Sequence, residues 1–351
     1  MMSSTFLSTL PYPIILAPML GVVTPKMVAD VANIGGLGSL PLGGLSPEAS
    51  RKLIQETKRL TKNEFAVNLF ANTAPDLNSN KIATEKMAHF IQSILKEKNW
   101  AQDFEFNYQF YPYQDLIDLI IEEKIKYVSF TFGVLDEKSV KKLKTHHIYT
   151  MGTATCVEEA VELEKSGVDA IVAQGIEAGG HRGSFLNEKS LPYIGLIALV
   201  TQIKDAVNIP VIASGGLYDK RTIAAAFDMG ADAVQIGSHF ISAEESAATD
   251  VYRDLIKKST DTSTILTKSY TGRWARGICN DFMKLTELNQ LTIPEYPIQN
   301  VLTQAMRNLA KKHNDTQFTN YWAGQNAKYA RHIPTTEIMN ELISIYKIIK
   351  Q

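Results

Sequence analysis

The chain has 351 residues, of which 45% are hydrophobic and 21% are charged, and its formal net charge is -1. This composition is that of an ordinary soluble globular protein, long enough for one large α/β barrel with an appended subdomain, or for two domains. The 36 basic and 37 acidic residues nearly balance, so the sequence has no excess of positive charge that would predict binding to nucleic acid or to an anionic membrane. We therefore expect a small-molecule ligand.

The cysteines and the hydropathy of the sequence indicate the cellular compartment of the protein. Cys156 and Cys279 match no metal-ligand spacing and are too few for a disulfide framework. The start of the chain has no basic segment followed by an apolar run, and no run of about 18 apolar residues occurs in the sequence. We expect a cytoplasmic protein with no membrane span and no bound metal. The sequence leaves its oligomeric state open.

Short apolar runs alternate with stretches of helical periodicity, which is the pattern of parallel β/α units. We predict that eight such runs form the closed parallel sheet of a TIM barrel. Helix starts are marked by caps, as at Ser46 before Pro47 and at Asp219. The predicted strands cover residues 14–19, 36–40, 65–70, 127–132, 147–152, 170–173, 211–213 and 233–236.

Two stretches interrupt this alternation. Residues 71–113 contain a predicted helix at 80–98 and an aromatic run at 104–113, which could cover the barrel mouth or form an interface patch. Residues 245–300 follow the eighth strand, and we predict that they form an inserted substrate subdomain that begins with a helix at 250–258. The barrel would then consist of residues 1–244 and 301–351, with the last helices returning to it.

The sixth strand runs directly into a glycine-rich loop that carries one histidine. Gln174 is the first polar side chain after this apolar strand, and four of the next nine residues are glycine. Glycine lets a backbone approach a ligand closely, and barrel enzymes place their active sites at the carboxyl ends of the strands. The four glycines therefore favour a His181 that is presented to a ligand, and a surface loop whose histidine lies in solvent is the alternative. Arg182 is expected to be a loop anchor or a surface charge.

The seventh and eighth strands both end in glycine. Ser214-Gly215-Gly216 and Gly237-Ser238 each lead toward a predicted helix. Bare backbone N–H groups and the positive end of a helix dipole favour an anion at such places. A tight turn would explain either end alone, but two of them on consecutive strands predict a phosphate site.

Several short motifs, taken together and in order, resemble the nitronate monooxygenase family, once called 2-nitropropane dioxygenases. The similarity spans nearly the whole chain. The motifs are Ile15-Leu16-Ala17-Pro18-Met19, Phe130-Thr131-Phe132-Gly133 and the segments 177–183, 213–216, 235–238, 270–277 and 322–325, with Asn68 on the third strand.

The resemblance implies an FMN-dependent enzyme that oxidises an alkyl nitronate with O₂ to a carbonyl compound and nitrite. It suggests a small toxic nitronate such as propionate 3-nitronate, and detoxification as the purpose. His181 falls on the family's active-site histidine, which either removes the α-proton of a nitroalkane or fixes the nitronate against the flavin. The implied flavin contacts are Asn68 and Gln174 at the ring system, and Gly179, Gly216, Gln235, Ile236, Gly237 and Ser238 toward the phosphate.

Two alternatives remain at this point. A flavin-type enoyl-acyl-carrier-protein reductase shares the barrel and a similar Gly-Gly-His loop but uses NAD(P)H, and segments 130–133, 181–183 and 270–277 favour the monooxygenase over it. A non-catalytic flavin-binding module would keep the flavin and tolerate replacement of His181. FMN is expected rather than FAD, because the chain has no additional GxGxxG fingerprint. The segment 216–221 departs from the family pattern and leaves the size of the substrate open.

Overall fold

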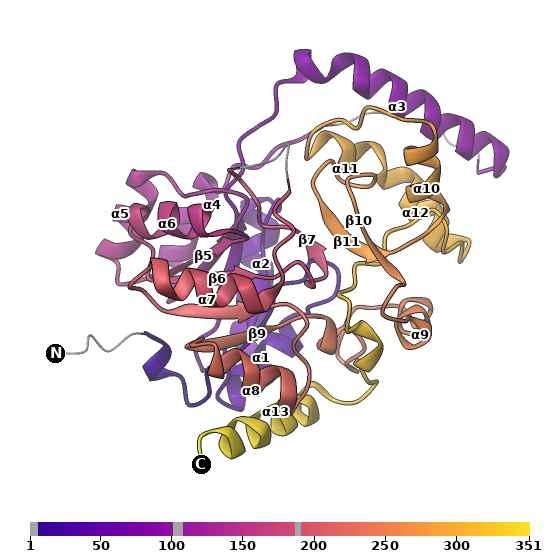
Figure 1. Cartoon of the computed structure of the whole chain (residues 1–351). Helices are drawn as coiled ribbons and strands as arrows, with labels where there is room; N and C mark the ends of the chain where they lie inside the picture. The colour runs from indigo at the N-terminus through magenta and orange to yellow at the C-terminus, as the bar shows by residue number, and fades with distance from the viewer. Residues whose placement is uncertain (1–5, 101–107, 187–190) are drawn as a thin grey trace.

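The computed structural model describes residues 6–100, 108–186 and 191–351, and its centre is a parallel barrel surrounded by helices (Figure 1). The eight barrel strands follow in the order β1-β9-β8-β6-β5-β4-β3-β2. An isolated parallel bridge between Ile15 and Leu37 closes the sheet, so the TIM-barrel prediction is confirmed. The strands are β1 (Ile14–Leu16), β2 (Ser39–Pro41), β3 (Ala66–Phe70), β4 (Tyr127–Thr131), β5 (Tyr149–Ala154), β6 (Ala170–Gln174), β8 (Val211–Ser214) and β9 (Ala233–Ile236).

Two strands begin two or three residues later than the sequence predicts. β2 begins at Ser39 instead of residue 36, because only Leu37 of the preceding segment bridges to β1. Gly38 there passes so close to the first helix that a Cβ atom would lie 2.3 Å from the carbonyl oxygen of Val28. β5 begins at Tyr149 instead of residue 147, because His147 has a φ of 55°, a left-handed conformation typical of a turn.

The outer helices begin at the predicted caps. The Ser46 hydroxyl accepts a hydrogen bond from the N–H of Ala49 at 3.2 Å, and Asp219 forms a capping box with Thr222. The helices around the barrel are α1 (Pro25–Asn33), α2 (Pro47–Leu60), α4 (Gln114–Glu122), α5 (Glu137–Thr145), α6 (Val157–Ser166), α7 (Leu196–Ala206), α8 (Lys220–Asp228) and α13 (Thr335–Ile349).

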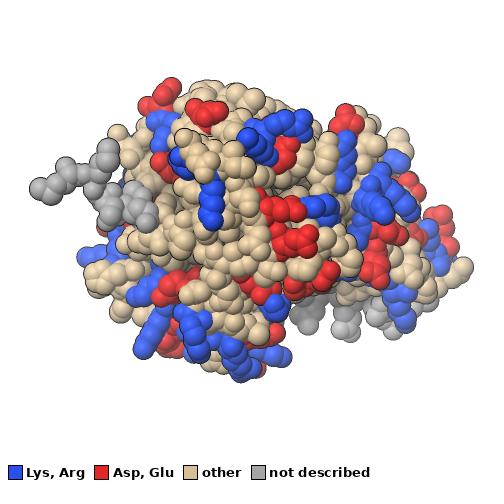
Figure 2. Space-filling view, turned by 90° about the horizontal axis from the view of Figure 1, so that it is seen from below, with Lys and Arg blue, Asp and Glu red and all other residues tan. Residues whose placement is uncertain are grey.

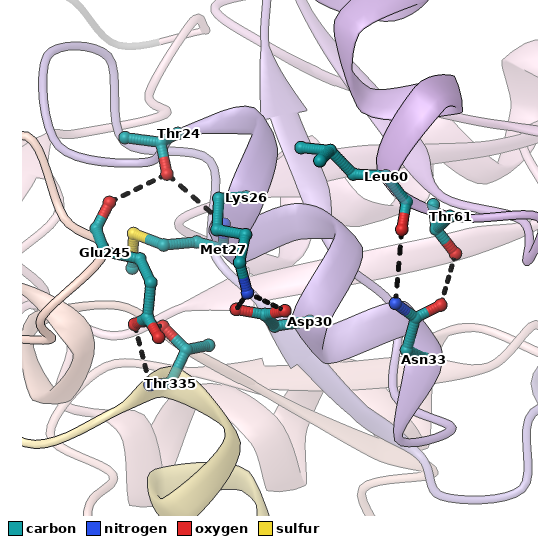
Figure 3. A network of polar contacts seen from close by, with 9 residues as sticks. All are labelled: Thr24, Lys26, Met27, Asp30, Asn33, Leu60, Thr61, Glu245 and Thr335. Carbon is teal, nitrogen blue, oxygen red and sulfur yellow. Dashed lines mark hydrogen bonds and ion pairs between the residues drawn. The ribbon is translucent and has the colours of Figure 1, made fainter.

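A polar network joins the start of α1 to the start of α13 (Figure 3). The Thr24 hydroxyl caps α1 and donates to the backbone carbonyl of Glu245 at 2.8 Å. The Glu245 carboxylate accepts hydrogen bonds from the N–H and the hydroxyl of Thr335, at 2.8 and 2.6 Å. Since Pro334 gives α13 no side-chain cap of its own, Glu245 supplies one from a distant part of the chain.

A second hydrophobic core lies beside the barrel, at the upper right of Figure 1. It contains Tyr270 and Phe282 together with apolar residues from helices before and after them, including Ile91 and Met306. Its helices are α3 (Leu77–Glu97), α10 (Asp281–Leu288), α11 (Ile298–Leu302) and α12 (Gln304–Lys312). Another helix, α9 (Asp250–Lys258), has the bounds that the sequence predicts for the first helix after the eighth strand. The division of the chain into domains at residues 245 and 300 stays a prediction.

A small three-stranded sheet stands between the two cores. It consists of β10 (Thr264–Thr267), β11 (Ala275–Ile278) and β7 (Gly180–His181), in the order β10-β11-β7. His181 pairs with Ala275 in this sheet. The histidine loop, which begins in the barrel, is therefore hydrogen-bonded to the strands that adjoin the second core.

The aromatic run predicted at 104–113 is described only in part, since residues 104–107 lie outside the described ranges. Tyr108 packs against the second core. Tyr113 is buried in the barrel core, where its hydroxyl donates to the Asp136 carboxylate at 2.8 Å. The described end of the run therefore contributes to both cores.

The face that Figure 2 shows carries charged side chains of both signs. Lys and Arg are interspersed there with Asp and Glu, as the balanced composition predicts. Among the helices that the structure describes, none is long and apolar enough to cross a membrane.

Candidate active site

A cavity of about 460 Å³ lies at the carboxyl ends of the barrel strands and extends to α11, α12 and the segment 320–326. Its lining brings together every residue that the sequence singled out for the site. That these residues bind a flavin stays a prediction. They are Asn68, Gln174, Gly179, His181, Gly216, Gln235, Ile236, Gly237 and Ser238.

Gln174 and Arg182 hold the histidine loop against the end of β6. The Gln174 amide donates to the backbone carbonyl of His181 and accepts from the N–H of Gly183, both at 2.9 Å. The Arg182 side chain turns inward, is only 1% exposed, and donates to the carbonyls of Gln174 and Gly175. Burial lowers the pKa of Arg182 to about 10, so the guanidinium stays charged at neutral pH. Arg182 is therefore a loop anchor and not a surface charge.

Glu159 anchors the other end of the same loop. Its side chain is fully buried on α6 and accepts hydrogen bonds from the N–H groups of Phe185 and Leu186, at 2.7 and 3.3 Å. It also accepts from the N–H and the hydroxyl of Thr155 at 2.7 Å each. Buried anchors on both sides fix the position of His181 over the cavity.

An aromatic cage surrounds the imidazole of His181. The centroids of the four cage rings lie between 5.5 and 6.5 Å from the centroid of the imidazole. Burial in this cage lowers the pKa of His181 to about 3, and the positive charges of Arg273 and Arg307 act in the same direction. His181 is therefore neutral at pH 7. The cage consists of Phe70, Phe132, Tyr296 and Trp322.

Thr271 orients the imidazole. Its hydroxyl oxygen lies 2.9 Å from Nε2 of His181, and the same hydroxyl donates to the carbonyl of Arg273 at 3.3 Å. Either group can donate in the contact between Thr271 and Nε2, depending on the tautomer of the ring. Nδ1 is the ring nitrogen that Thr271 does not contact.

The glycine-rich ends of β8 and β9 have the chemistry of an anion site. Gly215 and Gly216 have φ values of 121° and 69°, which favour glycine. The N–H groups of Gly216 and Gly237 donate to no acceptor within the described part of the chain. β9 leads into the single 3₁₀ turn η2 (Ser238–Phe240) and not into a longer helix, so backbone N–H groups, rather than a helix dipole, would hold the anion there.

The segment 322–325, near the C-terminus, and its neighbour Asn326 form hydrogen bonds with the glycine-rich ends of β8 and β9. The N–H of Gly324 donates to the Ser238 hydroxyl at 2.9 Å, and the Asn326 amide donates to the carbonyl of Gly216 at 2.8 Å. Motifs that are far apart in the sequence are thus brought into one site. On the opposite side, the Asn68 amide donates to the Ser129 hydroxyl at 2.9 Å, which leaves its carbonyl oxygen as an acceptor.

Several cavity residues escaped the sequence analysis because they belong to no recognisable motif. They lie in or just before α11 and α12, on one side of these helices, at a spacing of three or four residues. That spacing on a polar helix face is the one signal that could have pointed to them. They are Tyr296, Asn300, Gln304, Arg307 and Lys311.

The family model described as nitronate monooxygenase matches residues 4–344. The chain belongs to the nitronate monooxygenase family. A probable nitronate monooxygenase from Staphylococcus aureus (strain MRSA252) is 40% identical over 341 residues, which cover 97% of this chain and 96% of the relative. The resemblance inferred from the short motifs is therefore confirmed.

Two solved structures extend this comparison. Nitroalkane oxidase from Streptomyces ansochromogenes superposes with a TM-score of 0.90 at 32% identity, covering 99% of both chains. FabK from Thermotoga maritima gives a TM-score of 0.74 at 26% identity, covering 99% of this chain and 97% of the other. The enoyl reductase alternative is thus not favoured. The chain is an oxidoreductase of the nitronate monooxygenase family, whose members are flavin enzymes.

Proposed function

We propose that the protein uses FMN to oxidise alkyl nitronates with O₂, releasing a carbonyl compound and nitrite. The observation that carries this proposal is a neutral, caged His181 in the same cavity as two glycine-rich strand ends. When bound, FMN supplies the electron transfer between the nitronate and O₂. Every other step depends on how the chain positions its ligands.

The strand ends supply the contacts for the phosphate of FMN. The N–H groups of Gly216 and Gly237 point to no acceptor among the described residues, and both residues line the cavity with Ser238. The Asn68 carbonyl oxygen is an acceptor for an N–H group of the flavin ring. The Gln174 amide already forms two hydrogen bonds with the histidine loop. Its main role toward the flavin ring is therefore to hold that loop in place.

His181 holds the nitronate oxygens in this proposal. A group whose pKa lies near 3 is a weak base toward a nitroalkane carbon. When the Thr271 hydroxyl donates to Nε2, the neutral ring carries its proton on Nδ1 and can donate it to an oxygen of an anionic nitronate, and the aromatic cage excludes water from the carbon that reacts.

The experiment that tests this function is oxygen uptake by wild type and His181→Asn, with a preformed nitronate and with its parent nitroalkane. An orienting histidine predicts that both substrates lose rate together. If the histidine were instead the essential base, the nitroalkane alone would lose roughly 10²- to 10⁴-fold. Unchanged rates with both substrates, or no nitrite release by the wild type, would exclude the proposed role.

A further inference from the structure

A pair of stacked tyrosines stands beyond the glycine-rich end of β8. The rings of Tyr218 and Tyr329 are nearly parallel, at an interplanar angle of 5°, and their centroids lie 4.1 Å apart. Tyr218 is half-buried and lines the cavity, whereas Tyr329 is 39% exposed and is outside the cavity lining. Tyr329 is the last residue of the 3₁₀ turn η3 (Ala327–Tyr329). The stack therefore joins the cavity wall to a distant segment of the chain.

Tyr218 is also held by the start of α8. Its N–H donates to the Thr222 hydroxyl at 3.1 Å, and its own hydroxyl accepts from the Arg221 guanidinium at 3.1 Å. Both partners stand in the first turn of α8. The position of Tyr218 is thus fixed by α8 and η3 together.

Residues 326–329, which we call the clasp, hold residues 215–218, which we call the β8 loop, at two points. The Asn326 amide donates to the carbonyl of Gly216 at 2.8 Å. Two residues later in the loop, the Tyr218 ring stacks on Tyr329. Leu217, between these two contacts, is buried. The clasp therefore restrains the backbone that carries the Gly216 N–H.

The β8 loop depends on such restraint, because the strand ends bring no lysine or arginine into the cavity. Among the described residues that line it, the Lys and Arg residues are Arg307 and Lys311, and both belong to α12. His239 lines the cavity next to Ser238, but burial lowers its pKa to about 4, so it is neutral at pH 7. An anion at the strand ends is then bound by neutral donors such as the Gly216 N–H. Neutral donors bind an anion well only when they are already held in position.

We propose that the clasp, through the Tyr218–Tyr329 stack, positions the N–H groups of the β8 loop for the phosphate of the flavin cofactor. This inference rests on the proposed function and gives a role to Tyr329, which lies outside the cavity lining. Tyr329 is a positioning residue, because it acts on the cofactor through Tyr218. The stack is built on the segment 216–221, where the sequence departs from the family pattern.

FMN and riboflavin together test the clasp, because riboflavin lacks the phosphate. Fluorescence of the flavin released from diluted holoenzyme gives the dissociation constant for FMN, and the same measurement after exchange of FMN for riboflavin gives the reference. Tyr329→Ala removes the stack and should weaken FMN binding roughly 2- to 10-fold, the range expected for one aromatic pair. Riboflavin should bind wild type and variant equally, so the preference for FMN should fall by the same factor.

Two further variants serve as controls. Tyr329→Phe keeps the ring and should bind FMN to within about twofold of wild type. Tyr193→Ala removes the same side chain from a position that is 68% exposed and outside the cavity lining, and it should leave both constants unchanged. Unchanged FMN binding in Tyr329→Ala would overturn the clasp. Equal weakening of FMN and riboflavin would also overturn it, because that result indicates a general loosening of the cavity.

The wild-type preference separates this inference from the proposed function. A wild type that binds FMN no more tightly than riboflavin would refute the phosphate site and the clasp together. A wild type that prefers FMN, with the same preference in Tyr329→Ala, would refute the clasp alone. No nitronate enters these measurements, so a protein that binds FMN through the clasp but oxidises no nitronate would refute only the proposed function.

Discussion

His181 is held from two directions, by hydrogen bonds to its backbone from Gln174 and β11 and by one contact to its ring from Thr271. The sequence predicted the histidine because it stands in a glycine-rich loop after a strand. Thr271 could not be assigned to it in this way, because 90 residues separate the two and only the folded β7–β11 pairing brings them together.

Replacing Thr271 by Val should free the ring while keeping the volume of the side chain. We expect kcat/KM for nitronates to fall roughly tenfold, the effect of one neutral hydrogen bond. Thr271→Ser keeps the hydroxyl and should restore most of the rate. Oxygen uptake with a preformed nitronate measures both variants, and a Val variant as active as wild type would exclude the orienting contact.

Gly216 allows an equally specific test of the phosphate site. With a φ of 69°, this residue favours glycine, and Gly216→Leu adds a side chain at the proposed phosphate contact. The purified variant should lose its bound flavin, measured by visible absorbance, while circular dichroism shows a folded protein. Gly230→Leu is the control, because Gly230 also has a positive φ, 95°, but lies outside the cavity lining. Flavin loss in both variants alike would point to general backbone strain instead.

At the scale of whole elements, local signals predicted helix starts well. The caps at Ser46 and Asp219 are contacts between residues three positions apart, so the sequence contains all of their information. β7 was missed for the opposite reason. It has two residues, and its partner strand β11 lies more than 90 residues later in the chain, so no local pattern distinguishes it from a loop.

The distant cap on α13 gives a prediction for stability. Burial alone would raise the pKa of Glu245, but the hydrogen bonds from Thr335 outweigh it and lower that pKa below its ordinary value. A carboxylate whose pKa is lower in the folded state stabilises the protein above its unfolded pKa, near 4, and this contribution is lost as the pH falls through the folded pKa.

We therefore expect Glu245→Gln to lower the free energy of unfolding by about 1 kcal/mol at pH 7. The difference from wild type should shrink toward zero as the pH falls below the folded pKa of Glu245. Urea unfolding at several pH values measures this, with Glu244→Gln, an exposed neighbour, as the control. A difference independent of pH would show that the charge of Glu245 is not involved.

At the scale of the whole molecule, the cavity is shared by the barrel and the second core, since its lining includes barrel strand ends together with α11 and α12. The sequence predicted the barrel because each β/α unit repeats a short local pattern. The residues of the second core come from segments as distant as Ile91 and Met306, and nothing in their local sequence indicates that they meet.

A ligand that contacts both cores should stabilise the entire protein. At a concentration 1,000-fold above its dissociation constant, FMN should add about 4 kcal/mol to the free energy of unfolding of the flavin-free protein. Riboflavin lacks the phosphate and should give a much smaller shift at the same concentration. Thermal unfolding with each compound measures the difference, and equal shifts would exclude a phosphate site at the ends of β8 and β9.

The shared cavity also has an evolutionary consequence. On the proposed function, the contacts that retain the cofactor lie mainly at barrel strand ends, whereas α11 and α12 contribute cavity residues from the second core. Substitutions in these two helices can then change the shape and charge of the cavity without removing the flavin contacts. A lineage could acquire a new substrate in single steps, each of which leaves a working redox enzyme.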